Sequence, residues 1–211
     1  MESKDYLKDI SEIKNIMNRS SRFISLSGLS GVLAGIYALI AACIAHKKLN
    51  TLAYMDYTSL SGKDPIRLET EIIYELIFIA ICVVILAITS GIILSVKKAK
   101  KKKEKLWDVS SKRLVVNFLI PLFVGGLFCI VLLQYGIFFL VAPTTLIFYG
   151  LACVNASKYT LGDVRYLGIS NIIIGLIATQ FIGYGLYFWA LGFGVFHIFY
   201  GTLMHFKHDR K

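Results

Sequence analysis

Five polar side chains lie inside long apolar runs of this sequence, and they are the residues best placed for chemistry. They are Ser30, Tyr149, Asn171, His197 and Tyr200. At helical spacing His197 shares a face with Gly194 and Gly201, and Asn171 lies on a similar face of small residues. Lipid penalises polar groups that face it, so we expect these faces to point toward neighbouring helices.

The depths of these residues suggest that they form one layer. We count from the end of each apolar run that is predicted to be cytoplasmic. Ser30, Tyr149 and Asn171 lie seven residues from that end, and His197 lies eight. At the helical rise this is about 10 to 12 Å. Two interpretations fit a polar layer at that depth. It is either a pore-lining or ligand site, or a hydrogen-bond network that fixes packing at about 0.6 kcal/mol per bond.

Motifs for catalysis are absent from the sequence. It contains no HExxH, GxSxG, GxGxxG or Walker pattern. The four cysteines form no CxxC pair, and His205 and His208 have no third ligand within reach along the sequence. We therefore predict no catalytic residues, no metal site and no cofactor, and a protein that is not an enzyme.

The elements that position the polar residues are apolar helices. Of the 211 residues 56% are hydrophobic and only 17% are charged, with a mean hydropathy of +0.67, which excludes an ordinary soluble domain. Six stretches are long enough to cross about 30 Å of hydrocarbon. They are residues 23–45, 72–96, 114–133, 137–156, 164–182 and 186–205. The predicted fold is an all-α membrane protein, a six-span bundle over 23–211.

Basic residues set the predicted orientation. Nineteen of the 23 Lys and Arg residues fall on one side of a six-span arrangement, which is therefore cytoplasmic and holds both termini. The cytoplasmic connection 97–113 is the most basic, and we predict lipid headgroup contacts for Lys100, Lys101, Lys102 and Lys103. The alternative is that these charges only set the orientation of the helices in the membrane. The external connection 46–71 is the longest on its side and suits either a functional loop or a short surface helix.

Residues 1–22 form a predicted amphipathic helix. Tyr6, Ile10, Ile13 and Met17 recur at helical spacing, with charged residues opposite. Such a helix lies along the cytoplasmic membrane surface or binds a partner or a second copy. The spacing fits both alternatives.

The first span has one smooth face. Ser27, Gly31 and Gly35 are spaced four apart, a pattern that lets helix backbones approach closely in lipid. We predict helix packing through these three residues and through Gly194 and Gly201 of the last span. The first span is thus expected to be the helix around which the bundle packs.

The second half of the chain contains an internal repeat. Tyr135-Gly-Ile-Phe-Phe opens the fourth span and Tyr184-Gly-Leu-Tyr-Phe opens the sixth. Near the ends of the same spans, Phe148-Tyr149-Gly150 recurs as Phe199-Tyr200-Gly201. This pattern predicts two tandem helical hairpins that are parallel, since each begins and ends in the cytoplasm.

Three further residues are unusual for apolar spans. Glu75 lies one turn inside the second span, where Lys48 or a neighbouring basic residue is expected to neutralise it at the membrane rim. Pro121 and Pro143 lie inside the third and fourth spans. A proline frees a helix carbonyl, so kinks are expected there.

Three runs of the sequence resemble a known group of proteins. SSRFISLSGLSGVLAGIYALIAA, TLIFYGLACVNASKYTLG and GYGLYFWALGFGVFHIFYG look like an uncharacterised family of small bacterial six-span membrane proteins. The resemblance covers most of the chain from Ser20 to Met204. It implies a bacterial plasma membrane, but it brings no activity and no site residues.

Together these patterns favour a non-catalytic integral membrane module that senses or scaffolds. The alternative is a small transporter or channel with its site at the repeat interface, around His197 and Asn171. The expected partners are the lipid bilayer, including anionic lipids, and a second copy or another membrane or cytoplasmic protein. No nucleic-acid partner is expected.

Overall fold

The computed structural model describes residues 27–58, 65–102 and 107–209, and side chains within 27–50, 71–101 and 107–207. Helix is the regular structure throughout these ranges, and none of their residues lies in a strand. The predicted amphipathic helix over 1–22 lies outside the described residues. The elements are α2 (Gly28–Thr58), α3 (Pro65–Lys102), α4 (Val109–Gln134), η1 (Phe138–Leu140), α5 (Val141–Ala156), η2 (Ser157–Tyr159), α6 (Val164–Ala178), α7 (Gly185–Trp189), η3 (Ala190–Val195), α8 (Phe196–Met204) and η4 (His205–Asp209).

Five of the described helices are long and apolar enough to cross a membrane, which confirms an all-helical fold typical of a membrane protein. Their apolar stretches are Gly28–Asn50, Glu71–Lys101, Val109–Gln134, Phe138–Tyr159 and Gly185–Lys207. The fifth predicted span, residues 164–182, corresponds to α6. This helix has only 15 residues. It measures about 22 Å. It ends at Ala178, where the backbone changes to single turns, and Gly183 in this connection has a φ of 89°.

The helices extend farther than the apolar stretches do. α2 continues to Thr58 and α3 begins at Pro65, so most of the expected external connection 46–71 is helical. Residues 46–58 contain no Gly or Pro to interrupt a helix. Pro65 occupies the first position of α3, where its missing N–H costs nothing. On the other side α3 runs to Lys102, so the basic connection 97–113 also begins as helix.

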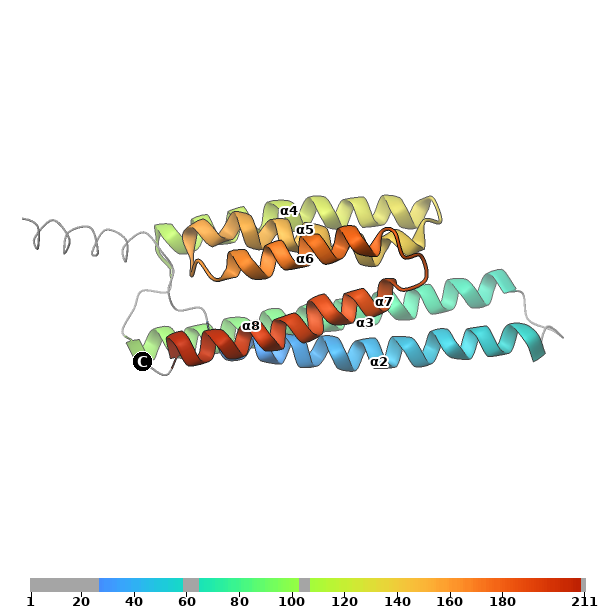
Figure 1. The fold of residues 1–211 in the computed structure, drawn as a ribbon, viewed down its shortest axis with the longest axis horizontal. Coiled ribbons are helices and arrows are strands. Elements are labelled where there is room, and N and C mark those ends of the chain that lie inside the picture. The colour runs from blue at the N-terminus through green and yellow to red at the C-terminus, as the bar shows by residue number, and fades with distance from the viewer. Residues whose placement is uncertain (1–26, 59–64, 103–106, 210–211) are drawn as a thin grey trace, which may run out of the picture. The chain divides into compact units, whose positions relative to one another are not determined.

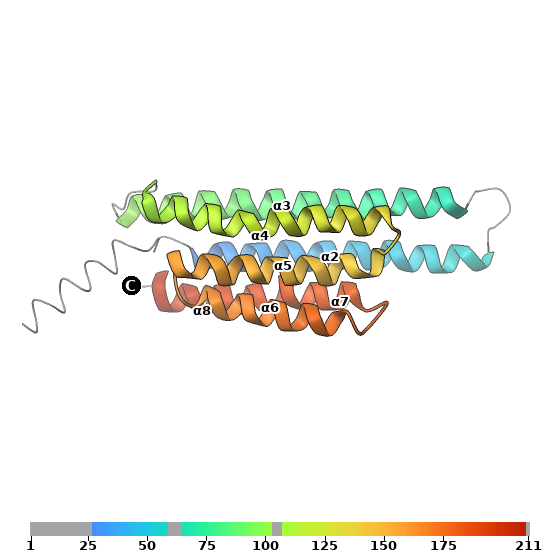
Figure 2. The ribbon, with the colours of Figure 1, turned by 90° about the horizontal axis from the view of Figure 1, so that it is seen from above.

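The chain divides into two compact units. Unit 1 contains Ser95–Leu176, with α4, α5 and α6, and unit 2 contains Ser27–Leu94 and Ile177–Lys211, with α2, most of α3 and the segment from α7 to η4. In unit 1, α4, α5 and α6 run lengthwise beside one another (Figure 1). In unit 2, α7, η3, α8 and η4 form one continuous helical segment (Figure 2).

Local hydrogen bonds begin and end α4. The Asp108 carboxylate accepts from the Ser111 N–H at 2.7 Å, and the Ser111 hydroxyl accepts from the Asp108 N–H at 2.8 Å. This capping box satisfies two backbone donors that have no partner inside the helix. At the other end Gly136, with a φ of 71°, lets the chain turn into η1 and α5. α4 and α5 are therefore antiparallel neighbours in unit 1.

Glycines bring α5 and α6 into backbone contact. A Cβ on Gly150 would lie 2.5 Å from the carbonyl oxygen of Gly168, and a Cβ on Gly168 would lie 2.7 Å from that of Gly150. Farther along, a Cβ on Gly175 would lie 3.0 Å from the carbonyl oxygen of Pro143. Only glycine permits this approach, which also places Cα–H groups against carbonyl oxygens of the facing helix.

A similar contact joins α2 and α8 in unit 2. Gly31 lies against Gly201, where an added Cβ would be 3.2 Å from the Gly201 Cα. Gly35 lies against Gly194, where an added Cβ would be 2.6 Å from the carbonyl oxygen. The small face of α2 is buried at Ser27 and at Ala38, Ala42 and Ala45, whereas Leu29, Ile36 and Ile40 on the opposite face are exposed.

The two helices of the second predicted hairpin belong to different units, α6 to unit 1 and α7–α8 to unit 2. Within the units, the two Phe-Tyr-Gly motifs nevertheless use their glycine in the same way. Gly150 meets the backbone of α6 at Gly168, and Gly201 meets the backbone of α2 at Gly28. The tandem repeat itself stays a prediction from the sequence.

Candidate functional site

His197 lies in unit 2 directly after a π-helical segment. η3 (Ala190–Val195) has the wider helical turn, and α8 continues from it. The side chain is 6% exposed, and its Nδ1 donates to the carbonyl oxygen of Gly192 at 2.9 Å. Because a carbonyl can only accept, Nδ1 of the ring carries a proton.

Aromatic rings continue from His197 along the same helical segment. The Phe193 and His197 rings are stacked, with centroids 5.7 Å apart and planes at 25°. The Trp189 and Phe193 rings follow at 5.1 Å. The imidazole is therefore held on one side by a ring and at Nδ1 by a backbone carbonyl, so its orientation is fixed.

Ser30 and Tyr200 accompany His197 in unit 2. Ser30 donates from its hydroxyl to the Ser27 carbonyl oxygen at 2.6 Å. The next residue, Gly31, has its Cβ position 3.5 Å from the His197 carbonyl oxygen, so the turn of α2 that carries Ser30 crosses the turn of α8 that carries His197. Tyr200 follows on α8 and is half-buried.

Asn171 and Tyr149 lie in unit 1. Asn171 is fully buried on α6, and its Nδ2 donates to the Leu167 carbonyl oxygen at 2.9 Å. Its Oδ1 is buried and has no hydrogen-bond partner among the residues that the structure describes. Tyr149 lies on α5, where its ring meets Phe118 of α4 edge to face, with centroids 6.0 Å apart.

The five residues of the predicted polar layer are thus divided between the units. Ser30, His197 and Tyr200 belong to unit 2, and Tyr149 and Asn171 belong to unit 1. In each unit the structure brings the polar residues near a glycine contact between two helices. A single layer that contains all five residues stays a prediction.

One hydrogen bond between helices was not predicted from the sequence. Pro121 has no N–H, so the carbonyl of Asn117, four residues earlier in α4, has no donor within the helix. The Nδ2 of Asn155 on α5 donates to that oxygen at 2.9 Å. Pro121 itself was the available signal, because a proline inside a helix always frees the carbonyl four residues before it. The partner on α5 could not be identified from spacing.

The expected neutralisation of Glu75 is present. Lys48 Nζ of α2 lies 2.5 Å from Glu75 Oε2 of α3, in unit 2. Nearby on α2, His46 Nε2 and Asn50 Nδ2 are 3.0 Å apart, and the His46 ring meets Tyr187 edge to face. Both members of the ion pair are exposed, so the pair positions two side chains and adds little stability.

Metal ligands do not gather in the described parts of the chain. No group of three or more His, Cys, Asp or Glu side chains there could hold a metal ion. Cys43, Cys82, Cys129 and Cys153 are free thiols.

The predicted headgroup contacts fall at the end of α3. Lys100 and Lys101 are exposed there. Lys103 and the side chain of Lys102 lie outside the described residues. The structure thus places two of the four lysines in solvent-accessible positions.

Protein-family models, curated proteins and solved structures were compared with the chain, and none of them matches it.

Proposed function

We propose that the protein is a non-catalytic membrane module that senses or scaffolds through contacts between helices. It lies in a bacterial plasma membrane with both termini in the cytoplasm, an orientation that the distribution of basic residues favours. Its partners are the bilayer and either a second copy or another protein.

One observation carries this proposal. Six buried or half-buried polar side chains donate to carbonyls three to five residues earlier in the chain, so these donors are already engaged within their own helical segment. The bonds are Ser30 to Ser27, Thr145 to Ala142, Ser157 to Val154, Asn171 to Leu167, His197 to Gly192 and Thr202 to Ile198. A transport pathway needs side chains that can exchange partners with a solute.

The helix contacts support the same conclusion. Within unit 1 the backbones of α5 and α6 meet at Gly150 and Gly168, and within unit 2 those of α2 and α8 meet at Gly31 and Gly201. At such contacts there is no room between the paired helices for a solute. Their role is adhesion, and the exposed apolar faces of α3 and α4 are available to lipid or to other helices.

Photocrosslinking in living cells tests this proposal. A photoreactive phenylalanine analogue is placed at Phe123 on the exposed face of α4, at Phe78 on that of α3 and, as a buried control, at Leu146. A scaffold gives a discrete adduct of constant mass from at least one exposed position and none from Leu146. If every exposed position gives only lipid adducts, the scaffold proposal is wrong.

A small transporter or channel is the second candidate, and a specific observation favours it. π-helical turns are rare and often accompany functional sites, and η3 carries the carbonyl that fixes His197. Ion flux into proteoliposomes separates the two functions. A transporter shows flux that His197→Ala abolishes without lowering thermal stability, whereas a scaffold shows no flux above lipid vesicles and His197→Ala lowers stability alone.

A further inference from the structure

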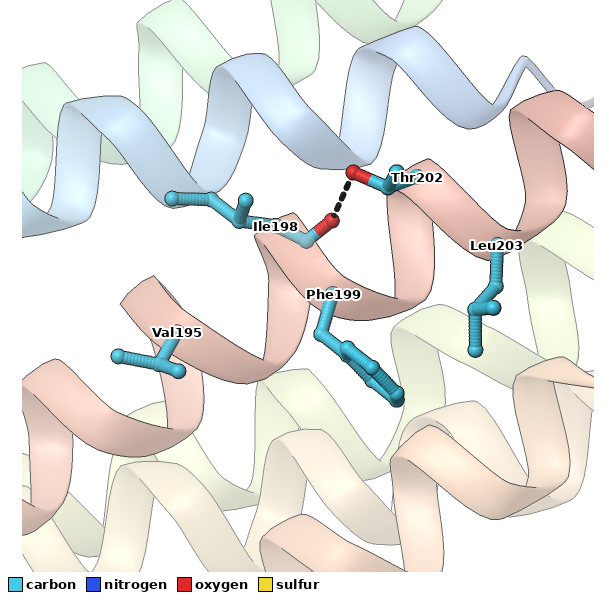
Figure 3. A pocket seen from close by; sticks show the side chains of 5 residues that line it. All are labelled: Val195, Ile198, Phe199, Thr202 and Leu203. Atoms are coloured by element: carbon cyan, nitrogen blue, oxygen red, sulfur yellow. Dashed lines mark hydrogen bonds between the residues drawn. The ribbon is translucent and has the colours of Figure 1, made fainter.

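An apolar hollow lies along one face of α8 in unit 2. It has a volume of about 340 Å³ and is lined by Val195, Ile198, Phe199, Thr202 and Leu203. From the first to the last of these residues the hollow extends about 12 Å along the helix. Figure 3 shows the Phe199 and Leu203 side chains pointing the same way.

The hydroxyl of Thr202, the one polar group among these five side chains, is engaged within the helix. The Thr202 hydroxyl donates to the Ile198 carbonyl oxygen at 2.7 Å, as the dashed line in Figure 3 shows. The hollow therefore presents hydrocarbon. Val195, Phe199 and Leu203 are about half exposed or more, so the face is accessible in the described structure. In a bilayer an apolar hollow of this length fits an acyl chain.

Positive charge follows directly after the hollow. Lys207 lies one helical turn beyond Leu203, about 6 Å along the axis, and its side chain is exposed. The sequence continues with His208, Asp209, Arg210 and Lys211, so the segment from Lys207 to Lys211 holds three basic residues and one acidic residue. An apolar hollow that is followed by an exposed lysine is complementary to a lipid with an anionic headgroup.

We propose that this face of α8 binds one anionic phospholipid, with an acyl chain in the hollow and the phosphate at Lys207. The charge also argues against a second copy as the occupant, because two α8 helices packed in parallel would bring their lysines together. A lipid phosphate, in contrast, brings a negative charge to the lysine. The proposal concerns a lipid site and is independent of whether the protein is a scaffold or a transporter.

Photoactivatable lipids test the proposal with the full-length protein in nanodiscs. Phosphatidylglycerol and phosphatidylcholine probes carry the same diazirine acyl chain, and labelled peptides are identified by mass spectrometry. We expect the phosphatidylglycerol probe to label the peptide with Phe199 and Leu203 about fivefold more than the phosphatidylcholine probe, because one lysine near an anionic headgroup contributes about that factor in affinity.

Two variants locate the site. Lys207→Gln should make the two probes label this peptide equally, whereas the matched change Lys101→Gln at the end of α3 should keep the difference. Leu203→Trp should fill the hollow and reduce labelling by both probes, and Ile93→Trp, at an exposed position of α3, is its control. Lys207 is exposed, so its variant folds even if the tryptophan variant does not.

Three results would overturn the lipid site. The first is equal labelling of α8 by both probes in the parent protein. The second is an equal effect of Lys207→Gln and Lys101→Gln. The third is labelling of α8 by both probes that Leu203→Trp leaves unchanged.

Discussion

At the scale of single residues, Asn155 completes a backbone hydrogen bond that Pro121 cannot make. The freed Asn117 carbonyl would otherwise be unpaired in an apolar helix, which costs about 1 to 3 kcal/mol for a buried group. Asn155 Nδ2 supplies the donor from α5 at 2.9 Å. The Asn155 side chain therefore joins α5 to α4 at the Asn117 carbonyl, which lacks a backbone donor within α4.

A double-mutant cycle tests this assignment. Asn155→Leu should lower the free energy of unfolding by about 1 kcal/mol, because the Asn117 carbonyl loses its donor. Pro121→Ala restores the backbone N–H to that carbonyl, so Asn155→Leu should cost much less in the Pro121→Ala background. Unfolding in mixed micelles with increasing denaturing detergent measures all four proteins. Additive effects of the two changes would show that the two residues act independently.

The polar residues illustrate what sequence can predict at this scale. Helical spacing alone places Asn171 and His197 on faces of small residues. Residues three or four apart along a helix share a face whatever the rest of the chain does. The actual partners of Asn171 and His197, the carbonyls of Leu167 and Gly192, depend on rotamers and on the π-helical turn. Neither is encoded in the spacing of residue types.

At the scale of elements, glycines determine how closely two helices approach. The stripe on α2 was predictable because small and large residues alternate with the helical period. Its position against α8 is a long-range pairing that the sequence suggested only through Gly194 and Gly201. The ends of α2 and α3 were predicted too short, since polar residues without Gly or Pro continue a helix beyond the membrane.

Substituting glycines tests whether a glycine matters because another helix packs against it or only because it lies in a span. Gly35→Leu should destabilise the protein by about 1 to 3 kcal/mol, because its Cβ would lie 2.6 Å from the Gly194 carbonyl oxygen. Relieving this clash requires the helix backbones to move apart. Gly91→Leu in α3 is the matched control, since a Cβ there meets nothing within 4 Å. It should be neutral or stabilising by up to about 1 kcal/mol through helix propensity.

The same detergent unfolding assay compares these two variants with the parent. If Gly35→Leu is as stable as Gly91→Leu, the α2–α8 contact contributes nothing to stability. A larger loss for Gly91→Leu would mean that α3 has a close partner at this position.

At the scale of the whole molecule, the number of spans decides the orientation of the termini. Five described helices are long enough to cross, and α6, with 15 residues, is shorter than the usual span. An even number of crossings places both termini on one side, and an odd number separates them. The basic residues argue for six, since only an even number gathers nineteen of the 23 on one side.

Cysteine accessibility determines whether α6 crosses. Lys158 lies before α6 and Gln180 follows it, and both are near turns. If α6 spans the membrane, Lys158→Cys should react with an impermeant maleimide only from the side that labels Lys207→Cys, and Gln180→Cys only from the opposite side. The native cysteines are replaced by alanine first, and Lys47→Cys marks the external side.

A short α6 can still span if the bilayer thins around it or if Thr179 and Gln180 lie at the interface, each at a modest cost in free energy. The labelling then follows the six-span pattern, and thicker bilayers made from longer acyl chains should lower stability more than thinner ones do. Reaction of Lys158→Cys and Gln180→Cys from the same side would instead show that α6 does not cross. In that case the five long helices would place Lys207 opposite the N-terminus, and 16 rather than 19 of the 23 basic residues would lie on the side of the N-terminus.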